Sequence, residues 1–94
     1  LVIGFAAETN NLIQNATKKL VEKQLDMIIA NFIDRENAIF GEEFNKIFII
    51  DKQSNIQESE KLTKNEIASL IISKTLKLHE ETYAKNYNRK SVKI

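Results

Sequence analysis

The sequence predicts an α/β fold, and three observations lead to this prediction. Two apolar segments, Leu1–Ala6 and Asp26–Ile33, have the near-continuous hydrophobic composition of strands that are buried on both faces. Between them, Asn10–Lys23 carries apolar residues at helical spacing. A strand, a helix of about four turns and a second strand form a βαβ unit, whose strands are parallel and whose crossover is right-handed in nearly all proteins.

The composition excludes several classes of protein. The chain has 94 residues, of which 43% are hydrophobic and 29% charged, as in an ordinary small globular domain. No apolar run approaches the roughly 20 residues of a membrane helix, and a formal net charge of +1 offers no field for nucleic acid or an anionic membrane. The absence of cysteine and the single histidine exclude disulfides, thiolate sites and histidine-rich zinc sites, while carboxylate-bound magnesium remains possible. No residue of this chain is assigned as a metal ligand. A cytoplasmic location is compatible with this usage.

The first strand runs into a loop of small residues. Gly4, Ala6 and Ala7 keep the backbone accessible where the strand ends, which allows close approach by a ligand or by a packed helix. In open α/β sheets, ligands bind at the carboxyl ends of the strands, beside the amino termini of the following helices. Thr9 or Asn10 is expected to cap the helix that follows.

Two lysines occupy unusual positions on the predicted helix. Leu12, Ile13, Ala16 and Leu20 form its apolar stripe. Lys19 and Lys23 lie within or beside this stripe, with Asn15 one turn earlier in the same row. They either extend outward to solvent or hold an anion between the helix and the sheet edge.

The second strand ends in a polar residue, Asn31, at the same sheet edge as Phe5. Asn31 either forms a turn or contacts a ligand. The main loop, Asp34–Asn45, contains Glu42 and Glu43, and such adjacent acids are more often solvated than metal-binding.

A hairpin and a terminal helix complete the predicted elements. Lys46–Asp51 reads as a strand that turns towards Ile56–Leu62, and a capping box begins at Thr63. The following helix has a wide apolar face, which we expect to pack on the sheet, with His79 at the edge of that face in a structural role. The pattern decays after about Glu81, so residues 84–94 are expected to form a frayed basic tail rather than a site for RNA or lipid.

Three motifs follow one another along the chain: Phe-Ala-Ala-Glu-Thr from Phe5, the segment Leu20–Asn31, and the loop residues Phe40, Gly41 and Asn45. Together they resemble the phosphopantothenate–cysteine ligase family, the synthetase module of the bacterial bifunctional coenzyme A flavoprotein. Leu20–Asn31 resembles the family's Lys-x-Leu-Asp-hydrophobic-Ala-Asn segment. Phe40, Gly41 and Asn45 resemble its Phe-Gly-acidic-Asn loop. The chain departs from the family at Phe32 and Ile33, where relatives usually carry Asp-Val, and at Glu42 and Glu43, where they carry a small residue and aspartate.

The resemblance implies a fold, an activity and a nucleotide site. The fold is the C-terminal part of a Rossmann-like three-layer domain, spanning residues 1–83. The activity is ligation of phosphopantothenate to cysteine with CTP and magnesium, through an acyl-cytidylate. Phe5, Lys19 and Lys23 match the residues that contact the nucleotide, and Ala6, Ala7 and Asn31 are possible residues of the ligand loop.

The resemblance also implies what this chain lacks. Its catalytic residues are expected upstream of Leu1, in a missing N-terminal half that acts as a partner, so the chain alone should be inactive. A dimer is expected, and FMN only if a decarboxylase domain lies upstream. The alternative is a non-catalytic α/β module that binds a nucleotide or a protein partner. A fragment, a split gene and a remnant remain open, as do the nucleotide preference and the role of the basic tail.

Overall fold

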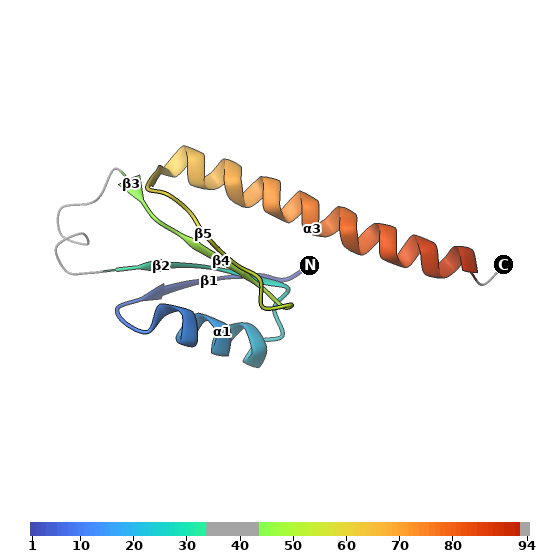
Figure 1. Cartoon of the computed structure of the whole chain (residues 1–94), viewed down its shortest axis with the longest axis horizontal. Helices are drawn as coiled ribbons and strands as arrows, with labels where there is room; N and C mark the ends of the chain where they lie inside the picture. Colours follow the sequence, from blue (N-terminus) through green and yellow to red (C-terminus); the bar gives the residue numbers. More distant parts are fainter. Residues whose placement is uncertain (34–43, 93–94) are drawn as a thin grey trace. The chain divides into compact units, whose positions relative to one another are not determined.

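The structure, a computed structural model, describes residues 1–33 and 44–92, which form a mixed α/β fold with a four-stranded sheet and a C-terminal helix (Figure 1). The elements are β1 (Ile3–Glu8), α1 (Leu12–Glu22), β2 (Met27–Phe32), β3 (Phe44–Asn45), β4 (Phe48–Asp51), β5 (Ile56–Glu58), β6 (Leu62–Thr63) and α3 (Lys64–Val92). They fall into two compact units, residues 1–64 and the helix from Asn65 onward.

The parallel βαβ unit is confirmed. β1 pairs with β2 in parallel from Ile3↔Met27 to Glu8↔Phe32. The helix is shorter than predicted, because Asn11 adopts a left-handed conformation (φ 46°) before its first turn and Gln24 does so (φ 53°) after its last. Asn11 is therefore the N-cap, in place of the predicted Thr9 or Asn10, and its side chain makes no capping hydrogen bond.

The sheet has the strand order β1-β2-β4-β5, with β4 antiparallel to both β2 and β5. The predicted hairpin is thus confirmed as β4–β5, and its turn contains Ser54 with a φ of 67°. A second, two-stranded sheet pairs β3 with β6. The predicted loop residues Phe40, Gly41, Glu42 and Glu43 lie outside the described residues.

One core cluster joins α1 to the sheet. Leu12, Ala16 and Leu20 of the predicted stripe of α1 are buried, and Ile13 is partly buried. They pack with Leu25, which precedes β2, and with strand residues of β1, β2 and β4: Ala6, Ile28, Ala30 and Ile50. In β2, the four residues from Met27 to Ala30 are at most 4% exposed. The prediction of a strand buried on both faces therefore holds for β2.

The same prediction is wrong for β1. Only Ala6 is buried there, whereas Val2 is 54% and Phe5 69% exposed. The physical reason is position, because β1 is an edge strand that pairs only with β2 within the described part of the chain. Gly4 does not open this strand to a ligand on the α1 side, since a Cβ there would lie 2.5 Å from Cδ1 of Leu25.

The helix α3 continues to Val92, past the point near Glu81 where the sequence pattern decays. Within this unit the half-buried residues follow helical spacing: Ile67, Leu70, Ile71, Lys74, Thr75 and Leu78. His79 is exposed, consistent with the structural role predicted for it. The packing of this face on the sheet stays a prediction. None of the helices in the described ranges has the length and apolarity to cross a membrane.

Asp26 connects the amino end of β1 to the β4–β5 turn through hydrogen bonds. Its Oδ2 accepts a hydrogen bond from the backbone N–H of Val2 (2.7 Å), and its Oδ1 accepts one from Nζ of Lys52 (3.0 Å). These two partners, the Val2 N–H first, lower the pKa of Asp26 below its ordinary value. The ionised carboxylate is therefore the form that stabilises the fold.

We expect Asp26→Asn to reduce the free energy of unfolding by about 1–2 kcal/mol at pH 7. Because the pKa of Asp26 is lowered in the folded state, its contribution is fully present above the unfolded-state pKa and is lost as the pH falls through the folded-state pKa. Urea denaturation at pH 7 and again well below pH ~4 should therefore show the difference from the wild type shrinking on acidification. Glu22→Gln is the control, since Glu22 is 59% exposed. An equal difference at both pH values would contradict this role.

Candidate nucleotide-binding site

The candidate site lies where β1 and β2 end together. The parallel register places Ala7 beside Asn31 and Glu8 beside Phe32. The predicted ligand-loop residues Ala6, Ala7 and Asn31 therefore do meet at one edge of the sheet, as the βαβ unit requires. Ala6 is buried under α1, Ala7 is exposed and Asn31 is half-buried.

Lys19 reaches this edge through an ion pair with Glu8. Its Nζ lies 2.7 Å from Oε1 of Glu8, whose side chain is only 11% exposed, and Lys19 itself is 40% exposed. Asn15 donates a long hydrogen bond to the other oxygen of Glu8 (3.4 Å) and a second bond to the carbonyl of Asn10 (3.1 Å). A carboxylate of β1 therefore anchors two members of the predicted polar row, Asn15 and Lys19.

Lys23 lies one helical turn beyond Lys19, immediately after α1, and its side chain is exposed. No ion pair involves it among the described residues. The two lysines thus differ in charge environment, because Glu8 neutralises Lys19 and no carboxylate of the described chain neutralises Lys23.

Phe5 lies on the other face of β1. Side chains alternate along a strand, and Ala6 and Glu8 both face α1, so Phe5 and Ala7 face away from it. Phe5 and Lys19 therefore flank the open edge of β1 from opposite sides. A ligand that touches both must lie across this edge.

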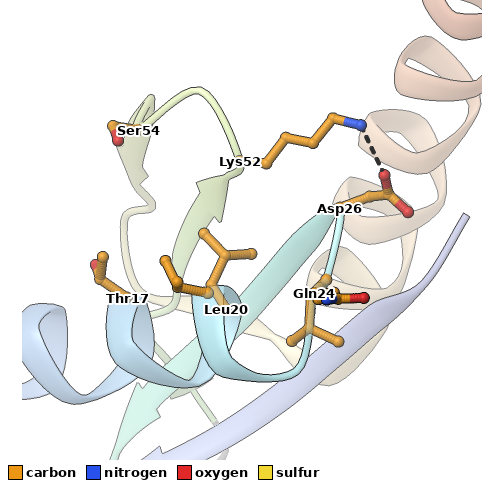
Figure 2. A pocket seen from close by; sticks show the side chains of 8 residues that line it. Thr17, Leu20, Gln24, Asp26, Lys52 and Ser54 are labelled. Carbon is orange, nitrogen blue, oxygen red and sulfur yellow. Dashed lines mark hydrogen bonds and ion pairs between the residues drawn. The ribbon is translucent and has the colours of Figure 1, made fainter.

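A pocket of about 290 Å³ lies elsewhere, at the carboxyl end of α1 (Figure 2). It is lined by Thr17, Leu20, Val21, Gln24, Leu25, Asp26, Lys52 and Ser54. Asp26 precedes β2, so the pocket is at the opposite end of this strand from Asn31. Its two charged groups pair with each other, as Figure 2 shows, and leave little charge for a ligand.

A second pocket, of about 390 Å³, is lined almost entirely by polar and charged side chains, Lys46, Glu58, Ser59, Glu60 and Lys61. Within the described ranges, no three histidine, cysteine, aspartate or glutamate residues gather as a metal site would require.

The comparisons with known proteins decide the family. Residues 1–78 match the family described as the DNA/pantothenate metabolism flavoprotein C-terminal domain. The chain belongs to this family. It is 49% identical over 73 residues to the coenzyme A biosynthesis bifunctional protein CoaBC of Borreliella burgdorferi, and 33% identical over 82 residues to that of Bacillus subtilis. It is 50% identical over 78 residues to a cysteine/cysteine sulfinic acid decarboxylase of an unknown prokaryotic organism.

Solved structures give the same fold. The C-terminal domain of a CoaBC protein superposes with a TM-score of 0.70 at 37% identity, covering 86% of this chain and 36% of that one. The DNA/pantothenate metabolism flavoprotein of Streptococcus pneumoniae gives 0.60 at 28% identity, with 79% and 31% covered. The match to the B. burgdorferi protein covers 77% of this chain and 17% of that protein, and the match to the decarboxylase 83% and 22%. The chain thus spans about a fifth of the length of these curated relatives.

Flavin is the cofactor that the family description suggests, and neither of the two pockets described above fits it. An isoalloxazine ring needs a largely apolar pocket with a few placed polar groups. One pocket contains the Asp26–Lys52 ion pair, and the other is lined by charged residues around a single serine. Neither pocket is lined by an aromatic side chain.

Sequence reasoning missed Glu8 as the partner of Lys19. A usable signal was present, because Glu8 stands two residues after Ala6, and a strand residue two positions from a core residue lies on the same face. The crossover helix covers that face, so a carboxylate there had to meet a polar group of α1.

Proposed function

We propose that this chain is the nucleotide-holding part of a ligase that joins phosphopantothenate to cysteine at the expense of CTP. The observation that carries the proposal is the placement of Lys19 on α1, with its ammonium at Glu8 beside the edge where Ala7 and Asn31 meet, and with Lys23 one turn farther along the chain. Membership of the family and the similarity to CoaBC proteins support it.

The proposed reaction has two stages. The carboxylate of phosphopantothenate attacks the α-phosphorus of CTP, which forms an acyl-cytidylate and releases pyrophosphate. The amine of cysteine then attacks the acyl carbon, and CMP leaves with the electron pair of the broken acyl–oxygen bond. Such chemistry depends on positioning and charge stabilisation more than on a protein nucleophile.

The residues of this chain would act on the phosphates and on the nucleoside. Lys19 and Lys23 would neutralise the triphosphate, to which magnesium would arrive already bound. The N–H groups of the first turn of α1, after Asn11, would donate to anionic oxygens. The exposed ring of Phe5 would bound the nucleoside on the other side of β1.

The proposed site is half of a complete one. The described residues would contact a nucleotide on one side only. The groups that bind the phosphates on the other side would come from an N-terminal half of the ligase domain. FMN would belong to a separate decarboxylase domain. The complete enzyme would work as a dimer.

We expect the 94 residues alone to show no measurable ligation. Positioning supplies about 7–11 kcal/mol of barrier lowering in well-oriented reactions, and a half-site cannot hold the reactants in line. The assay is pyrophosphate release from CTP, phosphopantothenate and cysteine, first with this chain and then with the N-terminal half of a relative's ligase domain added. Recovery of turnover on addition supports the proposal. Turnover by this chain alone, at the rate of an intact ligase, would contradict it.

A second candidate is a non-catalytic module that binds a nucleotide or a protein. The observation in its favour is the exposed apolar surface of β1 and the residues before it, formed by Leu1, Val2 and Phe5. Analytical ultracentrifugation separates the two, because an independent module should sediment as a monodisperse 94-residue monomer. A chain that becomes monodisperse only with a complementary half favours the ligase.

A further inference from the structure

Resting on the proposed function, we propose that Glu8 is a positioning residue that holds the Lys19 ammonium at the carboxyl end of β1 and is displaced from it by the phosphate of an incoming ligand. Glu8 thereby acts as an internal counter-ion for the site. Of these two lysines, Lys23 is then the one without a carboxylate partner among the described residues before the ligand arrives.

Glu8 and Lys19 form a closely held ion pair. A separation of 2.7 Å is that of a charge-assisted hydrogen bond, and Glu8 is nearly buried at 11% exposure. Asn15 approaches the second carboxylate oxygen and is itself fixed to the carbonyl of Asn10. Glu8 is therefore held from α1 at both of its oxygens, and the flexible chain of Lys19 is held in turn by Glu8.

Lys19 is accessible to an anion from the solvent. At 40% exposure its side chain is open to solvent although Glu8 is not. An anion can therefore approach the ammonium from the solvent side while the carboxylate stays behind it. Since an ammonium has three donor hydrogens, a phosphate oxygen can share Lys19 with Glu8 before it replaces it.

Lys19 and Lys23 differ in whether a carboxylate compensates their charge. Lys23 has no carboxylate partner in the described part of the chain, and it lies one turn beyond Lys19, just after α1 and farther from the carboxyl end of β1. A polyphosphate has several anionic oxygens along its length, so it can meet Lys23 first and Lys19 second. A mononucleotide monophosphate is too short to gain both charges, and the site therefore favours a polyphosphate.

The test is Glu8→Gln in the full-length protein, with inorganic tripolyphosphate and CTP as probes in calorimetric titrations. Glutamine keeps an acceptor oxygen for Lys19 and removes the competing charge, so tripolyphosphate should bind about threefold to tenfold more tightly. Glu22→Gln is the matched control, since it removes the same charge from the exposed pair with Lys18. That control should change the affinity less than twofold.

A Lys19→Met background distinguishes displacement from general repulsion. If Glu8 acts by occupying Lys19, the gain from Glu8→Gln should shrink when no ammonium is present. An equal gain in both backgrounds, no gain, or weaker binding in Glu8→Gln overturns the proposal. A thermal melt of each variant completes the test, because tighter binding by a less stable variant is not expected of a merely structural carboxylate.

Failure of the proposed function would give a different set of binding results from failure of the role of Glu8. If neither probe binds the wild type or any variant, the nucleotide site and the role of Glu8 are both wrong. If the wild type binds and Lys23→Ala does not, while Glu8→Gln leaves the affinity unchanged, only the role assigned to Glu8 is wrong.

Discussion

Replacing Lys19 and Lys23 together by alanine is expected to weaken CTP binding to the full-length protein by about two orders of magnitude, since a hydrogen bond to a charged group contributes about 1.5–3 kcal/mol. Lys23→Ala should leave stability unchanged, because that side chain is exposed. Lys19→Ala should also cost stability, because it leaves the nearly buried carboxylate of Glu8 without its ion pair.

Lys18→Ala is the control for this pair. Lys18 belongs to the same helix and carries the same charge, but it is 72% exposed and faces Glu22 at 3.9 Å. Its replacement should leave CTP affinity within about twofold of the wild type. Titration calorimetry and a thermal melt on each variant provide the two readouts. CTP affinity that is unchanged in the double variant would return both lysines to a solvent-exposed structural role.

Replacing Ile28 by alanine is expected to have the largest effect on stability, about 2–5 kcal/mol. Ile28 is 1% exposed and lies in the cluster that joins β2 to α1, so the lost side chain leaves a cavity that its neighbours fill only in part. Much of the marginal stability of a small domain would be lost. Urea denaturation measures the change.

Ile56→Ala is the matched control, since it makes the same chemical change in the edge strand β5 at a side chain that is 53% exposed. We expect it to cost less than about 1 kcal/mol. Equal losses in the two variants would mean that the core is not centred on β2.

The sequence was sufficient for β1, α1, β2, the β4–β5 hairpin and the start of α3, and for the pairing of β1 with β2, but not for the small β3–β6 sheet. Hydrophobic periodicity reports which residues avoid water, and the apolar stripe of α1 is buried as its spacing predicts. The crossover rule then makes β1 and β2 parallel, and this brings Ala7 and Asn31 together.

Periodicity does not report position within the sheet. Val2 and Phe5 have the composition of a buried strand, yet β1 lies at an edge and both side chains are exposed. Nothing in the order of the residues states which strand lacks a neighbour.

The sequence pattern places Glu8 on the face that α1 covers, but it does not state which polar group of α1 pairs with it. Glu8 and Lys19 are 11 residues apart, and their ion pair forms only because the crossover folds α1 over β1. The helix ends were misplaced for a related reason, since Asn11 and Gln24 enter the left-handed region that the pattern of apolar residues does not register.

Those left-handed residues bear on how the fold could be made more stable. In residues 1–33 and 44–64, three connections turn through a side-chain-bearing residue with positive φ, namely Asn11, Gln24 and Ser54. The two glycines of the sequence stand elsewhere, at positions 4 and 41. A left-handed conformation costs an ordinary residue roughly 1–2 kcal/mol, and less for asparagine. Gln24 is exposed and its backbone N–H donates to the carbonyl of Val21, a bond that glycine can also make, and its carboxamide is not part of the candidate site. We therefore expect Gln24→Gly, in the turn after α1, to increase stability without changing the edge where Lys19 and Glu8 meet.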